Sequence, residues 1–155
     1  MRNNIRDDSF YLKECIKEAK KAYMQDEVPV GSVIVLDGKI IARAHNKREQ
    51  KKSSISHAEV EAILKACKKT GQKFLDGATI YVTLEPCLMC LGAIIQARIS
   101  RIVYSCPEMK FGALNSCPEV LSYYKSNHKV EYEIGEYTEE VKMLMSSFFK
   151  QKRGK

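Results

Sequence analysis

One histidine, two cysteines and one glutamate stand at a spacing that could support metal-assisted hydrolysis. His57 and Glu59 are two residues apart, and Cys87 and Cys90 follow about thirty residues later. One imidazole and two thiolates can hold Zn²⁺ and leave its fourth position open to water, and an open position distinguishes a catalytic zinc from a structural one. Glu59 is not needed as a ligand, so its carboxylate is available for proton transfer. These four residues predict a catalytic zinc site.

The two cysteines follow Pro86, where we expect a helix to begin because proline is tolerated in the first turn. Two thiols three residues apart can face one metal, and the helix N-terminus lowers their pKa values. A C-x-x-C pair alone could equally be a redox pair or half of a structural zinc site. No second C-x-x-C is present, and the accompanying His57 favours catalytic zinc.

Glu59 is expected on a helix whose buried face is small and apolar. On that helix it shares a face with Ala62, Ile63 and Ala66. A carboxylate aimed into an apolar interior is costly unless it has a partner or a task. We expect it to take a proton from the attacking water and to pass it to the substrate ring and then to the departing amine. Glu61, four residues before Lys65, is expected instead to form a solvated ion pair.

Hydrophobic periodicity and turn signals predict the elements that position these residues. The expected elements are a helix over 8–25, strands over 31–36 and 39–44, a loop over 46–56, a helix that ends at Lys68–Gly71, a strand over 78–83, a helix from Pro86, strands over 101–104 and 129–133, and a last helix from Thr138. The helix that ends at Lys68–Gly71 carries Val60, Ile63, Leu64 and Cys67 on one stripe. The last helix should turn Val141, Leu144, Met145 and Phe148 inward. Asp37-Gly38 predicts an antiparallel hairpin, and the later strands should be parallel. The order indicates a three-layer α/β/α sandwich with a mixed central sheet. Residues 106–127 have the weakest pattern.

The third helix is apolar almost all round, from Leu88 to Ile95. A helix without a polar face must be covered on more than one side. The sheet can cover one side, and either a second copy of the chain or the rest of the monomer can cover the other. We favour a homodimer.

Length and composition limit the classes of protein that fit. The 155 residues (1–155) suit a single domain, and no apolar run is long enough to span a membrane. Two of the six cysteines form the C-x-x-C pair and the other four are scattered, which does not resemble a disulfide framework. We therefore expect Cys15 and Cys67 to be small buried side chains and the protein to be cytoplasmic.

The net charge of +7 favours a polyanionic partner. Two basic clusters carry much of this charge. The first comprises Arg43, Lys47, Arg48, Lys51 and Lys52 and is opposed only by Glu49; the second comprises Lys150, Lys152, Arg153 and Lys155. The first leads directly into His57, which favours a role at the predicted site over a merely solvated face.

Several motifs together resemble the bacterial tRNA-specific adenosine deaminases, within the cytidine deaminase-like zinc deaminase superfamily. The order H-x-E…P-C-x-x-C is the signature of zinc nucleobase deaminases. The motifs that narrow the likeness are Pro29-Val30-Gly31, Ala44-His45-Asn46, His57-Ala58-Glu59, the run from Thr83 to Ala93, Lys110-Phe111-Gly112-Ala113 and Ser147-Phe148-Phe149-Lys150. The resemblance implies hydrolytic deamination of adenosine to inosine at the wobble position of the anticodon, mainly in the arginine tRNA with an ACG anticodon. It also implies a homodimer with one Zn²⁺ per subunit.

The same resemblance implies roles at matching positions. His57, Cys87 and Cys90 would bind zinc, and Glu59 would move protons. The substrate contacts implied for the tRNA anticodon stem-loop are Asn46, Ala58 through its backbone, Phe148, Phe149 and Lys110. Phe148 also falls on the apolar stripe of the last helix, so it could instead be a core residue.

Two other functions share part of this pattern. A deaminase of free guanine, cytosine or a small nucleoside would use the same zinc motif, but it would not need the basic segments or the Asn46 motif. A zinc-containing RNA-binding module without catalysis would not need the non-ligating Glu59.

Overall fold

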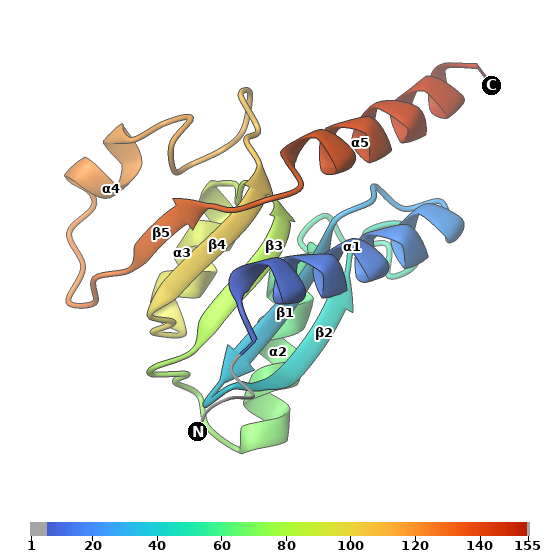
Figure 1. The fold of residues 1–155 in the computed structure, drawn as a ribbon. Helices are drawn as coiled ribbons and strands as arrows, with labels where there is room; N and C mark the ends of the chain where they lie inside the picture. Colours follow the sequence, from blue (N-terminus) through green and yellow to red (C-terminus); the bar gives the residue numbers. More distant parts are fainter. Residues whose placement is uncertain (1–5, 155) are drawn as a thin grey trace.

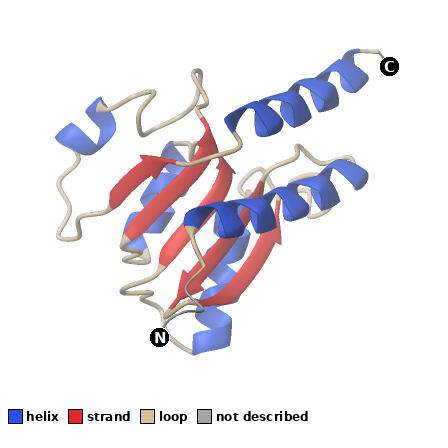
Figure 2. Cartoon of the chain, in the orientation of Figure 1, coloured by secondary structure: helices blue, strands red, loops and turns tan. Residues whose placement is uncertain are grey.

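A central sheet of five strands, in the order β2-β1-β3-β4-β5, organises the chain in the computed structural model, which describes residues 6–154 (Figures 1 and 2). The elements along the chain are α1 (Asp8–Met24), β1 (Gly31–Leu36), β2 (Lys39–His45), α2 (Ala58–Thr70), β3 (Thr79–Leu84), α3 (Leu88–Gln96), β4 (Arg101–Cys106), α4 (Glu119–Tyr123), β5 (Glu131–Ile134) and α5 (Thr138–Arg153). Strand β1 is antiparallel to both β2 and β3, whereas β3, β4 and β5 are parallel. The predicted mixed sheet is confirmed.

Helices cover both faces of this sheet. Helices α1 and α5 lie on one face and α2 and α3 on the other (Figure 1). The side of the sheet that α2 and α3 cover carries the largest apolar core, which includes Ile34, Ile80, Val82, Ile94 and Ile102. The α/β/α sandwich expected from the element order is therefore present. None of the described helices is long and apolar enough to cross a membrane.

Helix α3 begins two residues later than the sequence predicted. Cys87, not Pro86, is the residue next to its first turn, and Cys87 has an extended backbone with ψ of 176°. The reason is a backbone pairing: Cys87 forms an isolated bridge with Gly112, and the carbonyl of Pro86 accepts a hydrogen bond from the N–H of Ala113. The segment before α3 is therefore tied to a distant loop, which local pattern cannot reveal.

Helix α2 also buries a different stripe from the one expected. Leu64 is 60% exposed, while Ala58, Ala62 and Ala66 are fully buried. The small side chains let α2 approach the sheet closely, so the larger Leu64 faces outward. Cys67 is only half-buried, whereas Cys15 is buried as expected.

The prediction that Glu61 forms a solvated pair with Lys65 is wrong. Glu61 is buried and pairs with Lys51 at 2.8 Å, because the loop before α2 folds back over the start of the helix. The ammonium of Lys65 instead donates to the carbonyl of Arg43. Short-range spacing therefore identified the wrong partner.

Helix α5 follows its predicted stripe in part. Val141 and Phe148 are buried, and Leu144 and Met145 are half-buried. The short α4 lies in residues 106–127, where the hydrophobic pattern is weakest.

Candidate active site

The beginnings of α2 and α3 bring the three predicted metal ligands together. His57 immediately precedes α2, Cys87 immediately precedes α3, and Cys90 lies in the first turn of α3. The His57 Nδ1 atom lies 3.7 Å from the Cys87 Sγ atom and 3.4 Å from the Cys90 Sγ atom. Two helix N-termini thus point at one spot, and their dipoles favour negative charge on the sulfurs.

These distances fit a tetrahedral zinc ion. With Zn–S near 2.3 Å and Zn–N near 2.0–2.1 Å, a tetrahedral angle places a nitrogen and a sulfur ligand about 3.6 Å apart. The three ligand atoms all lie within 4.8 Å of one another, and a histidine with two cysteines is a donor set that zinc prefers. A fourth position would remain for water or substrate. The residues therefore suit zinc.

The cysteines have unequal pKa values. The hydrogen bond between the two thiols lowers the pKa of Cys87 to about 4, despite partial burial, and the His57 ring acts in the same direction. The same hydrogen bond raises the pKa of Cys90. The lowered pKa of Cys87 favours the thiolate, which is the form that binds a metal.

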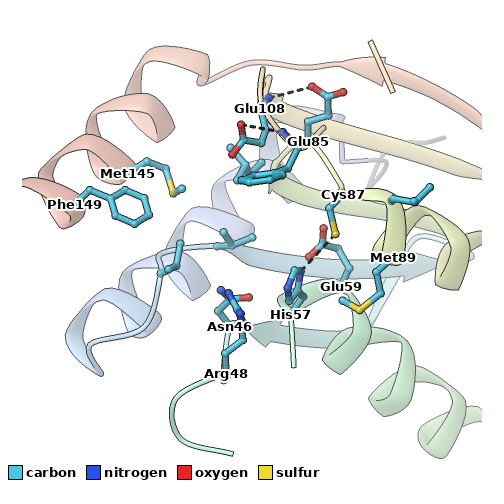
Figure 3. Close-up of a pocket in the computed structure, with 15 residues that line it drawn as sticks. Asn46, Arg48, His57, Glu59, Glu85, Cys87, Met89, Glu108, Met145 and Phe149 are labelled. Carbon is cyan, nitrogen blue, oxygen red and sulfur yellow. Dashed lines mark hydrogen bonds between the residues drawn. The ribbon is translucent and has the colours of Figure 1, made fainter. Parts of the chain in front are cut away.

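Glu59 lies beside this group on the first turn of α2 (Figure 3). It is 4% exposed, and burial raises its pKa to about 7. A carboxyl group with a pKa near neutrality can both accept and release a proton. The structure thus places Glu59 beside the predicted metal ligands as a buried carboxyl group with a raised pKa.

A pocket of about 630 Å³ opens onto His57, Glu59 and Cys87. Its volume lies within the range of small-molecule sites. The other lining residues are Val28, Val30, Asn46, Arg48, Leu84, Glu85, Leu88, Met89, Glu108, Phe111, Met145 and Phe149. Apolar side chains with a few polar groups are typical of a site for a small molecule.

Asn46 lines the pocket in a defined orientation (Figure 3). Its Oδ1 atom accepts a hydrogen bond from the N–H of Ala58 at 3.0 Å. This bond assigns the amide, because only the oxygen can accept from a backbone N–H. The NH₂ group of Asn46 is left as the donor for a ligand. Ala58 is fully buried, and its N–H is used by Asn46.

The structure separates the two phenylalanines of α5. Phe149 lines the pocket and is 41% exposed, whereas Phe148 is 4% exposed. The Phe148 ring packs edge-on against Tyr23, with 5.6 Å between ring centroids. Phe149 is therefore the better placed of the two to contact a ligand in this pocket, and the core reading of Phe148 fits its burial. Lys110 does not line the pocket; its ammonium lies over the exposed ring of Phe111.

Glu85 is a site residue to which the sequence analysis gave no role. Its carboxylate accepts backbone N–H bonds from Glu108, Leu114 and Ser116 at 2.9–3.0 Å, and a further bond from the Ser116 hydroxyl. Burial alone would raise the pKa of Glu85, but these donors hold it below its ordinary value. Glu85 thus fixes the loop that carries Glu108 and Phe111 to the pocket (Figure 3). Its position next to Pro86-Cys87 is the sequence feature that could have indicated a role at the site.

The basic cluster before His57 is less cationic than the sequence suggested. Arg43 pairs with Glu14, and Lys51 pairs with Glu61, so the expectation that only Glu49 opposes this cluster is wrong. Distant acidic residues reach the cluster only through the fold. Arg48 is the cluster member that lines the pocket. In the second cluster, Lys152 pairs with Asp26, and Lys155 lies outside the described residues.

The sheet, the His-Cys-Cys group and the buried Glu59 define a deaminase with a cytidine deaminase-like fold. The MafB19-like deaminase family model matches residues 6–153. The tRNA-specific adenosine deaminase of Bacillus subtilis (strain 168) is 46% identical over 148 residues, which cover 96% of this chain and 92% of that protein. The corresponding protein of Aquifex aeolicus (strain VF5) is 42% identical and covers 93% of this chain and 95% of its own length. The chain belongs to the tRNA-specific adenosine deaminase family.

Solved structures support this placement. A structure from a study of A-to-I editing by tRNA:A34 deaminases at the wobble position of transfer RNA is 40% identical, with a TM-score of 0.78 over 82% of this chain and 98% of that one. A guanine deaminase from Bacillus subtilis is 30% identical, with a TM-score of 0.65 over 92% of this chain and 94% of that one. The chain therefore also shares its fold with a protein named a guanine deaminase, and guanine is a free base.

Proposed function

We propose that the protein deaminates adenosine to inosine at the wobble position of a tRNA anticodon, mainly in the arginine tRNA with an ACG anticodon. The observation that carries this proposal is the buried Glu59 beside the His57–Cys87–Cys90 group, in a pocket lined by the Asn46 amide. The names of the relatives at 46% and 42% identity favour adenosine in tRNA as the substrate.

Each residue of the site has a separate role in the proposed reaction. Zinc held by His57, Cys87 and Cys90 would act as a Lewis acid that promotes ionisation of water at neutral pH. Glu59 accepts the proton that the attacking water loses as its oxygen bonds to C6 of the purine, and delivers it to N1. It then moves a second proton from that oxygen to the amine, which leaves as ammonia when the C6–N bond breaks. The Asn46 NH₂ group donates a hydrogen bond that orients the base.

An anticodon loop suits this pocket. Its bases are already unpaired, so turning one out costs little, and aromatic side chains can stack on the splayed bases. The exposed Phe149 ring at the pocket supplies such a surface, and Arg48 supplies a positive charge for the phosphate backbone. We also propose that the enzyme works in the cytoplasm, a reducing compartment in which its six free cysteines would persist.

We further propose that two chains form a homodimer through α2 and α3. Leu64 of α2 and Leu88 of α3 are 60% and 65% exposed, on helices that cover the same face of the sheet (Figure 1). Helix α3 is apolar almost all round and needs cover on a second side, which a partner chain at α2 and α3 would supply.

The test is inosine formation at the wobble position of an unmodified arginine tRNA with an ACG anticodon, with free guanine, cytosine and adenosine assayed in parallel. We expect inosine in the tRNA from the zinc-loaded wild type and none from Glu59→Ala with the same zinc content. Release of ammonia from guanine alone would replace this proposal with a free-base deaminase. Absence of any turnover by the zinc-loaded protein would contradict catalysis itself.

A further inference from the structure

Glu27 is a fully buried carboxylate outside the catalytic group. It lies in the connection between α1 and β1 and is 1% exposed. Its Oε1 atom accepts the N–H of Glu49 at 3.1 Å, and its Oε2 atom accepts the N–H of Gln50 at 2.8 Å. A buried charge of this kind is costly unless hydrogen bonds satisfy it, so these two bonds must be maintained in the folded protein.

The two N–H groups belong to a helical turn in the loop before α2. The N–H of Lys51 donates to the carbonyl of Lys47 at 2.9 Å, and the N–H of Ser53 donates to that of Arg48 at 3.0 Å. The first N–H groups of such a turn have no acceptor within it. Glu27 supplies that acceptor from a different part of the chain, as an N-cap side chain does for a helix.

Arg48 lies in this turn, at the edge of the catalytic pocket. It borders both the pocket that contains His57 and a second hollow of about 570 Å³, which Glu27 and Phe149 also border. Figure 3 shows Arg48 beside Asn46, at the side of the pocket where His57 lies. An arginine so placed can pair with a phosphate beside the base that occupies the pocket.

We propose that Glu27 is a positioning residue that holds the turn over 47–51, so that Arg48 meets the RNA phosphate next to the reacting nucleotide. This inference rests on the proposed RNA substrate. Glu27 does not touch the substrate; it acts through the backbone of Glu49 and Gln50. Replacing its carboxylate removes a charged acceptor from the turn, and Arg48 loses its fixed place at the pocket.

A double-mutant cycle with an anticodon stem-loop RNA tests this inference. Arg48→Gln, Glu27→Gln and the double variant are compared with wild type at equal zinc content. We expect each single change to raise KM about tenfold with little change in kcat, because Arg48→Gln removes a charge-assisted contact with the RNA and Glu27→Gln removes the support that places Arg48 for that contact. The double variant should be no weaker than Arg48→Gln alone. Additive losses would overturn the proposal, since they would mean that Glu27 acts without Arg48.

Two further measurements keep the outcome independent of folding and of the substrate. Glu131→Gln removes an exposed carboxylate from β5 and should leave KM unchanged. Amide hydrogen exchange should show that the N–H groups of Glu49 and Gln50 lose protection in Glu27→Gln, whatever the substrate is. Retained protection would overturn the positioning role, whereas lost protection without RNA turnover in wild type would contradict only the proposed function. Glu27→Asp keeps the charge and serves in the same cycle if Glu27→Gln does not fold.

Discussion

At the scale of single residues, the site depends on the contrast between Glu59 and its neighbour Glu61. Both are buried on the first turns of α2, but Glu61 has Lys51 as a partner, whereas Glu59 lies beside His57 and Cys87 at the pocket. The contact with Lys51 gives Glu61 a structural role. A carboxylate with a pKa near neutrality can serve as a proton carrier. The two side chains therefore provide a matched comparison.

Glu59→Gln should lower kcat by about 10²–10⁴-fold, because the amide keeps the shape but cannot carry a proton. Zinc content, measured by atomic spectrometry, should remain that of the wild type. Glu61→Gln is the control, and we expect its kcat to remain within a few-fold of wild type. An equal loss of kcat in both variants would mean that the effect is structural.

Removal of the metal should destabilise the protein as well as inactivate it. Without zinc, the Cys87 thiolate remains half-buried between the starts of α2 and α3 with no metal to neutralise it. A chelator should therefore lower Tm, as measured by calorimetry, and zinc should restore both Tm and activity. Cys90→Ser should have a Tm that no longer responds to the chelator. A chelator-sensitive Tm in Cys90→Ser would argue against this ligand.

At the scale of elements, the loop between β4 and α4 depends on one side chain of another element. Glu85 follows β3 and accepts bonds from Glu108, Leu114 and Ser116, so the loop has its main anchor outside itself. Gly112 lies directly against this carboxylate, because a Cβ atom there would be 2.4 Å from the Glu85 Cδ atom. The position of the pocket wall that contains Phe111 thus depends on Glu85, the residue that follows β3.

Glu85→Gln should lower the free energy of unfolding by about 2 kcal/mol, because the loop N–H groups lose a charged acceptor. Because the pKa of Glu85 is below its ordinary 4.5 in the folded protein, its stabilisation is present above pH 4.5 and is lost as the pH falls through the folded pKa. Urea unfolding below pH 4.5 should therefore show a smaller difference between wild type and variant than at pH 7. A difference that stays constant across this range would contradict the assignment.

At the scale of the whole molecule, the proposed dimer would cover the outward side of α2 and α3. Leu64→Glu should shift the protein to monomers, with a dissociation constant raised at least about tenfold, because a charge would be buried in the contact. Sedimentation velocity measures this shift. Met143→Glu, on the 70% exposed Met143 of α5, is the control and should leave the dimer intact. A wild type that sediments as a monomer would contradict the dimer directly.

The sequence predicted the parts of this protein that residue type and element order reveal. The hairpin at Asp37-Gly38 follows from turn chemistry, the mixed sheet follows from the order of the elements, and the proximity of His57 to Cys87 follows from the preference of zinc for these side chains. The partners of Glu85 could not be predicted in this way, because they are backbone N–H groups 23 to 31 residues along the chain, which every residue type except proline carries. The error over Glu61 has a different cause, since its partner Lys51 reaches it only through the fold of the loop before α2.

The fixed amide of Asn46 makes the pocket select bases by the hydrogen-bonding group that they present to it. Because the bond from the Ala58 N–H fixes the orientation of the amide, Asn46 presents its NH₂ group as a donor to whatever enters. A ring nitrogen with a free lone pair satisfies this group, whereas an N–H at the same place leaves two donors facing each other. The enzyme would thus reject a base by its tautomer as well as by its size, before any bond is broken.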